Sequence, residues 1–327
     1  MKQHKLPKLP NLLDRKIYKT GQTRGADDDE IYQNRVGRNS TILIPYSQFG
    51  KYLEDTIYKM EFESGYIVLL SPTEYYTENF SLKLKRQKLI LGENLLLFYE
   101  TREQWNDYNP FTKNLGPAFN RKKPLGGEFV ARIPATTAIE NGTKISYGFN
   151  ETKNKGAGIR AYEYAPAEVI RSTRMQLEAI FWHCRDSLNI VVDYGMNKKE
   201  AEERQAFIID LAKEKKLLDY NKLFSVRVLN KRKIAICPLC LEEISSKGFF
   251  TRLEQAEGRE VVDLTVTSLN LFHIEELKFG KFNHMPYNLG WGHHHCNVVA
   301  KDSGINNTLI WMHNTIEKNI KQGYITF

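Results

Sequence analysis

NLGWGHHHCN, residues 288–297, places three consecutive histidines and a cysteine between two asparagines. His293 and Cys296 in this stretch are spaced H-x-x-C, and Cys237 and Cys240 form a C-x-x-C pair in the upstream segment CPLC. Three thiolates and one imidazole match the closed tetrahedral sites in which proteins hold structural Zn²⁺. The spacing therefore predicts a zinc site that joins two distant segments of residues 230–327.

The remaining cysteine and histidines have simpler interpretations. Cys184 lies on the apolar stripe of a predicted helix and is assigned to the core. His294 and His295 are predicted to lie at a solvated helix start without binding metal, and His284 is predicted to be a loop residue. The alternative for the whole set is that Cys237 and Cys240 are buried thiols and the histidines lie on the surface.

A second pattern lies between the two cysteine-containing pairs. The strand-like run VVDLTVTSLNLF, residues 261–272, ends at His273. A loop follows, then Asn288 and Leu289, the H-x-x-C pair, and Asn297 directly after Cys296. Over roughly residues 234–305 this order resembles the HNH, or ββα-metal, nuclease superfamily. The resemblance implies a β-hairpin followed by a helix, with a treble-clef-like zinc site.

The resemblance also implies roles for three residues. His273 matches the general base that activates water, a task that suits imidazole because its pKa lies near the working pH. Asn288 matches the asparagine that braces the hairpin and orients the base. Asn297 matches a ligand of a catalytic divalent metal, separate from the zinc, and its carbonyl oxygen suits Mg²⁺ or Mn²⁺.

The sequence departs from the superfamily pattern at Phe272. Most relatives carry Asp, Glu or His at this position as a second metal ligand, and phenylalanine cannot bind metal. Glu275 is the first candidate for a replacement, because residues i and i+2 of a strand share a face. Asp302, which follows the H-x-x-C pair, is the second. Otherwise the metal is held weakly or the site is inactive.

Composition excludes some protein classes. The first 16 residues, MKQHKLPKLPNLLDRK, contain no apolar core of a signal peptide, and no apolar run is long enough for a membrane span. Four cysteines in 327 residues are too few for a disulfide framework, so we expect a cytoplasmic protein with no membrane partner. The net charge of +8 favours nucleic acid as partner, and the excess lies mainly outside residues 231–327.

The chain divides into three predicted zones of an α+β protein. Residues 1–165 contain short β-rich runs, among them STILIPY, GYIVLLSP and NLLLFYE, and are predicted to be a strand-rich DNA-recognition domain. Residues 166–229 contain two predicted helices, one following Pro166 and continuing through Leu188, the other over residues 198–216. They form a connector or dimer element, and residues 230–327 form the HNH nuclease domain.

This layout, a large basic region fused to a zinc-stapled nuclease, resembles Type II restriction endonucleases. The segment FHIEEL…HHHCN is similar to those of the BstXI kind. We therefore expect a sequence-specific endonuclease that cuts double-stranded DNA. One HNH site cuts one strand at a time, so a defined double-strand break favours a homodimer. A modification-dependent or homing-type nuclease, and a non-catalytic zinc-stapled DNA-binding protein, remain open alternatives.

Overall fold

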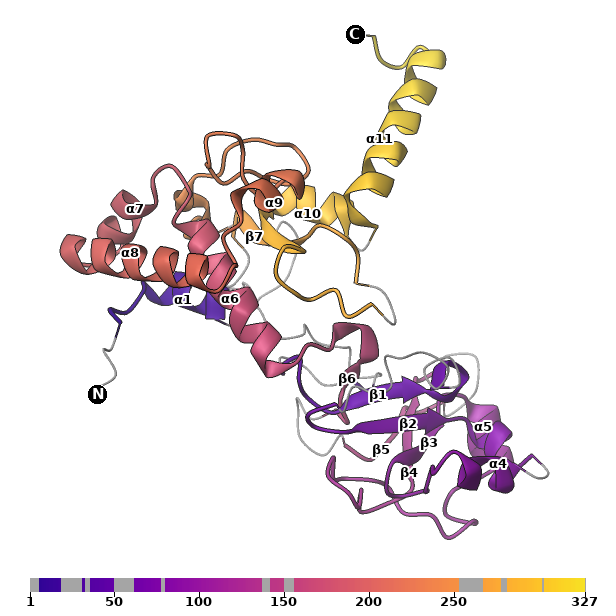
Figure 1. Ribbon diagram of the computed structural model, residues 1–327. Helices are drawn as coiled ribbons and strands as arrows, with labels where there is room; N and C mark the ends of the chain where they lie inside the picture. The colour runs from indigo at the N-terminus through magenta and orange to yellow at the C-terminus, as the bar shows by residue number, and fades with distance from the viewer. Residues whose placement is uncertain are drawn as a thin grey trace. The chain divides into compact units, whose positions relative to one another are not determined.

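The chain folds into two compact units, which are described separately. The computed structural model describes residues 6–18, 31–32, 36–49, 62–77, 80–136, 142–149, 156–252, 267–277, 281–301 and 303–326. The sheet unit comprises Gln22–Ala167, and the C-terminal unit comprises Met1–Gly21 together with Glu168–Phe327 (Figure 1). Among the described residues no helix is both long and apolar enough to cross a membrane.

The described part of the sheet unit is built on a six-stranded sheet in the order β5-β4-β3-β2-β1-β6. Its strands are β1 (Ile42–Pro45), β2 (Tyr66–Leu70), β3 (Leu95–Tyr99), β4 (Phe129–Ile133), β5 (Ile145–Tyr147) and β6 (Ile159–Arg160). All neighbouring pairs are parallel except β4 with β5. Short helices α3 (Pro72–Tyr75), α4 (Phe80–Arg86) and α5 (Arg102–Asp107) connect the central strands, and the 3₁₀ helix η2 (Ala161–Glu163) follows β6.

The central strands form because their sequences are almost continuously apolar. ILIP, YIVLL and LLLFY are buried along nearly their whole length, as in parallel strands that are covered on both faces. These three runs were predicted as strands, and their positions are confirmed. Their parallel pairing was not predicted.

The C-terminal unit contains most of the helices. They are α1 (Asn11–Tyr18), α6 (Ala167–Phe181), α7 (Ser187–Asp193), α8 (Lys198–Glu214), α9 (Tyr220–Ser225), η3 (Ser246–Phe249), α10 (His294–Ala300) and α11 (Gly304–Lys321). One core joins α1, α6, α8 and the hairpin of β7 (Leu269–His273) and β8 (Leu289–His293). Trp291 is central to this core, 1% exposed, and its indole Nε1 donates to the Leu177 carbonyl at 2.9 Å.

A buried ion pair ties the N-terminal helix to this unit. The Arg204 Nε on α8 lies 2.6 Å from Glu178 Oε1 on α6, and the two side chains are 7% and 0% exposed. The Tyr18 hydroxyl on α1 donates to the same carboxylate. Because three helices share one buried charge pair, Met1–Gly21 groups with residues far away in sequence.

The units therefore differ from the three predicted zones. Residues 166–229 and 230–327 share a core, and α1 packs with them instead of joining the strand-rich region. The first helix predicted after Pro166 is also broken in two, because α6 ends at Phe181 and α7 begins at Ser187. Asp186 between them accepts hydrogen bonds from Ser245 Oγ and, at 2.6 Å, from the Ser246 amide.

Candidate functional site

The upstream pair of cysteines lies in a tight turn. Ile236 and Glu243 form an antiparallel bridge, and the Cys237 amide donates to the Glu242 carbonyl at 2.9 Å. Leu241 has a positive φ of 65° and donates back to the Cys237 carbonyl at 2.9 Å. This closed turn directs the Cys237 and Cys240 side chains to one side.

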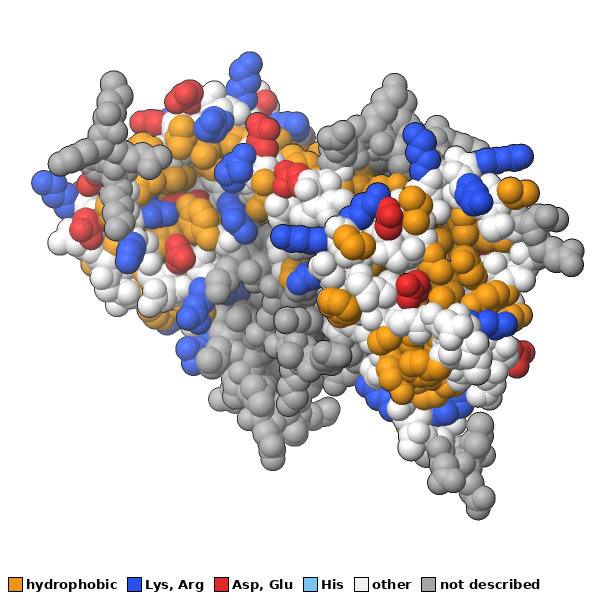
Figure 2. Space-filling view, turned by 90° about the horizontal axis from the view of Figure 1, so that it is seen from below, with side chains coloured by type: hydrophobic (Ala, Val, Ile, Leu, Met, Phe, Trp, Pro, Cys, Tyr) orange, Lys and Arg blue, Asp and Glu red, His pale blue; other side chains and the backbone are white. Residues whose placement is uncertain are grey.

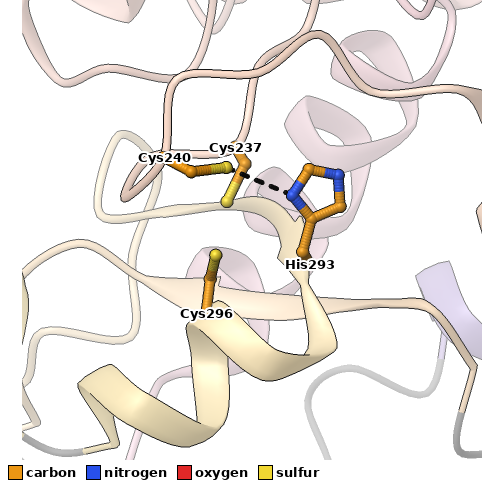
Figure 3. A group of neighbouring side chains, drawn as sticks. All are labelled: Cys237, Cys240, His293 and Cys296. Atoms are coloured by element: carbon orange, nitrogen blue, oxygen red, sulfur yellow. Dashed lines mark hydrogen bonds between the residues drawn. The ribbon is translucent and has the colours of Figure 1, made fainter.

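The downstream pair lies where β8 becomes α10. His293 is the last residue of β8 and caps α10, and Cys296 lies in the first turn of that helix. The ligand atoms of Cys237, Cys240, His293 and Cys296 all lie within 4.8 Å of one another. Figure 3 shows the four side chains pointing toward a common centre, with Cys240 Sγ 3.3 Å from His293 Nδ1. The structure therefore brings the two sequence-predicted pairs together.

The electrostatics of this cluster favour a cation. Burial and the neighbouring thiols raise the pKa of Cys240 and of Cys296, so that without a positive charge these groups hold their protons. Burial lowers the pKa of His293, which favours the neutral imidazole that binds metal. The donor set and the short mutual distances fit a tetrahedral zinc site, in which sulfur and nitrogen ligands lie about 2.0–2.3 Å from the ion. Among the described residues no other group of three or more His, Cys, Asp or Glu side chains lies close enough together to hold a metal ion.

The segment between the pairs forms a strand–strand–helix unit. β7 and β8 are antiparallel, with His273 opposite Leu289 and Leu269 opposite His293. α10 follows β8 directly and packs against both strands. Residues 261–266 of the predicted strand-like run lie outside the described residues.

Asn288 connects the two sides of the hairpin loop. Its side chain is 6% exposed, and its Oδ1 accepts from the Glu275 amide at 2.7 Å. Its Nδ2 donates to the carbonyls of Glu275 at 3.1 Å and Asn283 at 2.8 Å. An amide side chain supplies both a donor and an acceptor, which this position requires.

His273 lies at the end of β7 and is half-buried. Its Nε2 lies 3.3 Å from Nδ1 of His284, and the ring centroids are 5.6 Å apart. His284 lies in the loop between β7 and β8, as the sequence predicted, but it is 1% exposed, and this burial was not predicted. Its position only four residues before Asn288 had argued against a role in the site.

Phe272 is part of the core beneath the cysteine cluster. It is 0% exposed and packs with Cys237, Leu239 and Cys296. A Cβ atom added at Gly292, on the neighbouring strand β8, would lie 2.6 Å from Phe272 Cδ2. The phenylalanine therefore fills the space at the position that the resemblance to HNH nucleases matched with a metal ligand.

The other predicted metal-binding residues are more exposed. Asn297 is half-buried on α10, and Glu275 is exposed. β7 ends at His273, so Glu275 lies in the bend beyond the strand and the predicted alternation along one strand does not apply. Asp302 lies outside the described residues.

The two remaining histidines of the run differ in their surroundings. His295 is exposed, although its Nε2 lies 3.4 Å from Cys296 Sγ. The His294 Nδ1 lies 2.8 Å from Nδ2 of Asn270 on β7, so His294 is not simply a solvated residue. Cys184 is 4% exposed and lies in the main core, as expected.

The comparison with known protein families identifies the chain. A family model described as BstXI restriction endonuclease matches residues 15–294. The chain belongs to this family. The BstXI-family protein is therefore an endonuclease of the Type II restriction class, and it acts on DNA. No curated protein and no solved structure matches it at a significant level.

Proposed function

We propose that this BstXI-family endonuclease is of the HNH kind and makes sequence-specific double-strand breaks with a divalent metal and a histidine base. The observation that supports this most is the β7–β8–α10 unit, in which the Cys237–Cys240 pair lies against the His293–Cys296 pair where β8 becomes α10. The unit carries His273 at the strand end and Asn288 at the loop, in the order of the HNH superfamily.

The Cys₃His cluster would hold structural Zn²⁺. All four positions of a tetrahedral ion are filled by protein, which leaves none for substrate. The ion would fix the CPLC turn to the start of α10, and thereby the helix to the hairpin. Purified protein should contain about one zinc per chain. His293→Ala should lose it, whereas the matched variant His295→Ala, on the exposed neighbour, should keep it.

In the proposed reaction His273 takes a proton from a water molecule. The water oxygen then forms a bond to phosphorus, and the bond from phosphorus to the leaving sugar oxygen breaks. That oxygen takes up a proton from solvent water, so one strand end carries a phosphate and the other a hydroxyl. Asn288 would keep the loop in place during this step, since its amide joins Glu275 to Asn283.

A second divalent cation is needed for charge compensation, as is usual for restriction endonucleases. The carbonyl of Asn297 and the carboxylate of Glu275 are oxygen donors of the type that Mg²⁺ or Mn²⁺ prefers. When bound, the ion would neutralise the phosphate charge and stabilise the leaving oxygen. Phe272 cannot contribute, because it is enclosed in the core.

The sheet unit is the proposed recognition domain. A cavity of about 1050 Å³ lies beside the starts of β2 and β3, and its lining includes the basic run Arg121–Lys123. Phe119 lines the same cavity and is 70% exposed. Basic side chains suit phosphate contacts, and an exposed ring suits contact with bases. On the face drawn in Figure 2, Lys and Arg are interspersed with Asp, Glu and hydrophobic side chains, so no single basic surface covers it.

Cleavage of plasmid DNA with and without Mg²⁺ tests the proposal. We expect linear DNA only when Mg²⁺ is present, with fragment ends at one repeated sequence. Zinc-containing protein that cuts as well with an excess of a Mg²⁺ chelator as it does with Mg²⁺ would contradict the metal dependence. Fragments that arise only from methylated DNA would indicate a modification-dependent nuclease, and single-strand nicks alone would indicate a homing-type nicking enzyme.

A further inference from the structure

The hairpin loop presents a second histidine to the proposed base. His284 is among the most buried polar residues of the C-terminal unit, and its Nδ1 lies 3.3 Å from Nε2 of His273. A hydrogen bond between two imidazoles requires one ring to donate and the other to accept. The contact therefore bears on which nitrogen of His273 carries its proton.

The loop holds His284 firmly in this place. The preceding residue, Asn283, is 5% exposed and donates to the Glu276 carbonyl at 2.8 Å. The Asn283 carbonyl accepts from the Asn288 side chain and from the Met285 amide, at 2.8 and 2.9 Å. The Asn288 amide in turn donates to the Met285 carbonyl at 3.2 Å. These bonds fix the backbone on both sides of His284, so its ring is held against His273.

We propose that His284 is a positioning residue for His273. It accepts a hydrogen bond from Nε2–H of His273, which orients that ring and assigns the uptake of the proton from water to Nδ1. The proposal rests on the proposed role of His273 as general base. The Asn288 side chain would then affect the reaction indirectly, because it fixes the loop that carries His284.

The physical reason is that a general base must present one unprotonated nitrogen in a fixed direction. An imidazole on a strand end can rotate about its side-chain bonds and can exchange its two tautomers. A hydrogen bond to one nitrogen removes both freedoms. Misplacing a reacting group by about 1 Å costs on the order of 100-fold in rate, so loss of the His284 contact should be visible in kcat.

Two substitutions of nearly equal shape separate hydrogen bonding from packing. His284→Asn keeps a polar group close to the position of Nδ1, whereas His284→Leu fills a similar volume without one. We expect His284→Leu to lower kcat for cleavage on the order of 100-fold with KM unchanged, and His284→Asn to recover most of that loss. Thermal unfolding and zinc content of both variants, measured alongside, show whether each is folded.

A spectroscopic measurement does not depend on the variants. In wild-type protein with ¹⁵N-labelled histidine, the His273 signal, assigned by its loss in His273→Ala, should show the proton on Nε2. Wild-type protein with the proton on Nδ1 would overturn the proposal, and so would folded His284→Leu that cuts at the wild-type rate. His284→Asn that is as slow as His284→Leu while equally stable would also overturn it. His273→Ala that still cuts would instead overturn the proposed base, so the two failures are distinguishable.

Discussion

Replacing Phe272 by aspartate would install a carboxylate directly before His273, where most HNH nucleases carry one. We expect Phe272→Asp to unfold the hairpin region and abolish cleavage. Phe272 is 0% exposed, and it packs against the two buried cysteines of the Cys₃His cluster, Cys237 and Cys296. Its ring also lies over Gly292, where even one added carbon would lie 2.6 Å from it.

The magnitude follows from this burial. Removing a buried phenylalanine ring costs about 3–5 kcal/mol. An unpaired carboxylate in the same place adds several kcal/mol, because it loses its hydration without gaining a partner. The sum is comparable to the whole stability of a typical domain, about 5–15 kcal/mol. Phe272→Leu, the control, keeps an apolar side chain and should cost only about 1 kcal/mol.

Zinc content, urea unfolding and plasmid cleavage of the two variants provide the assay. Phe272→Asp should lose zinc and unfold its hairpin region without added urea, and Phe272→Leu should retain zinc and cleavage. If Phe272→Asp were folded, contained zinc and cut faster than wild type, a carboxylate at position 272 would be able to act as a ligand of the catalytic metal. The assignment of this residue to the core would then be wrong.

Three other predictions concern stability, DNA contact and assembly. Glu178→Gln should lower the free energy of unfolding by about 3–5 kcal/mol, because it leaves Arg204 buried without its partner charge. Glu202→Gln, on the exposed side of α8, should change the free energy of unfolding by less than about 0.5 kcal/mol. Equal urea midpoints for the two variants would contradict the buried ion pair. Arg121→Ala should weaken DNA binding to all sequences alike. The slope of log K against log salt concentration, measured by fluorescence anisotropy, should become shallower by about the amount expected for one phosphate contact. An unchanged slope would mean that this residue does not contact the DNA. Light scattering of the complex with a cleavable site should give two 38.0 kDa chains per DNA, and one chain per DNA would favour a nicking enzyme.

The Cys₃His cluster could be predicted from sequence because its two pairs are local. A C-x-x-C and an H-x-x-C spacing each bring two ligands together within one turn, so only the meeting of the two turns depends on the fold. The strands β1, β2 and β3 were likewise predictable from short, continuously apolar runs. Their parallel order was not, because an apolar run predicts a buried strand but not which strand it pairs with or in which direction.

Long-range contacts explain what the sequence did not predict. Helix α1 is stabilised by the packing of Leu13 and Ile17 into a core more than 150 residues away, so its short and interrupted sequence concealed it. The apolar periodicity of the predicted helix continued through Cys184 to Leu188, but α6 ends at Phe181, and Asp186, directly before α7, bonds to Ser245 and Ser246. His284 lies in a loop as predicted, but its burial against His273 could not be predicted, because only the closed hairpin brings the two rings together.

The cleavage rate of His273→Ala tests the central claim most directly, namely that the β7–β8–α10 unit is the nuclease and that His273 is its base. Single-turnover cleavage of a DNA fragment carrying the recognition site should be compared for wild type, His273→Ala and His313→Ala, which alters an exposed histidine on α11. We predict that His273→Ala loses on the order of 100- to 10,000-fold in rate while zinc content and DNA affinity stay unchanged, and that His313→Ala cuts normally. Cleavage by His273→Ala at the wild-type rate would contradict the claim.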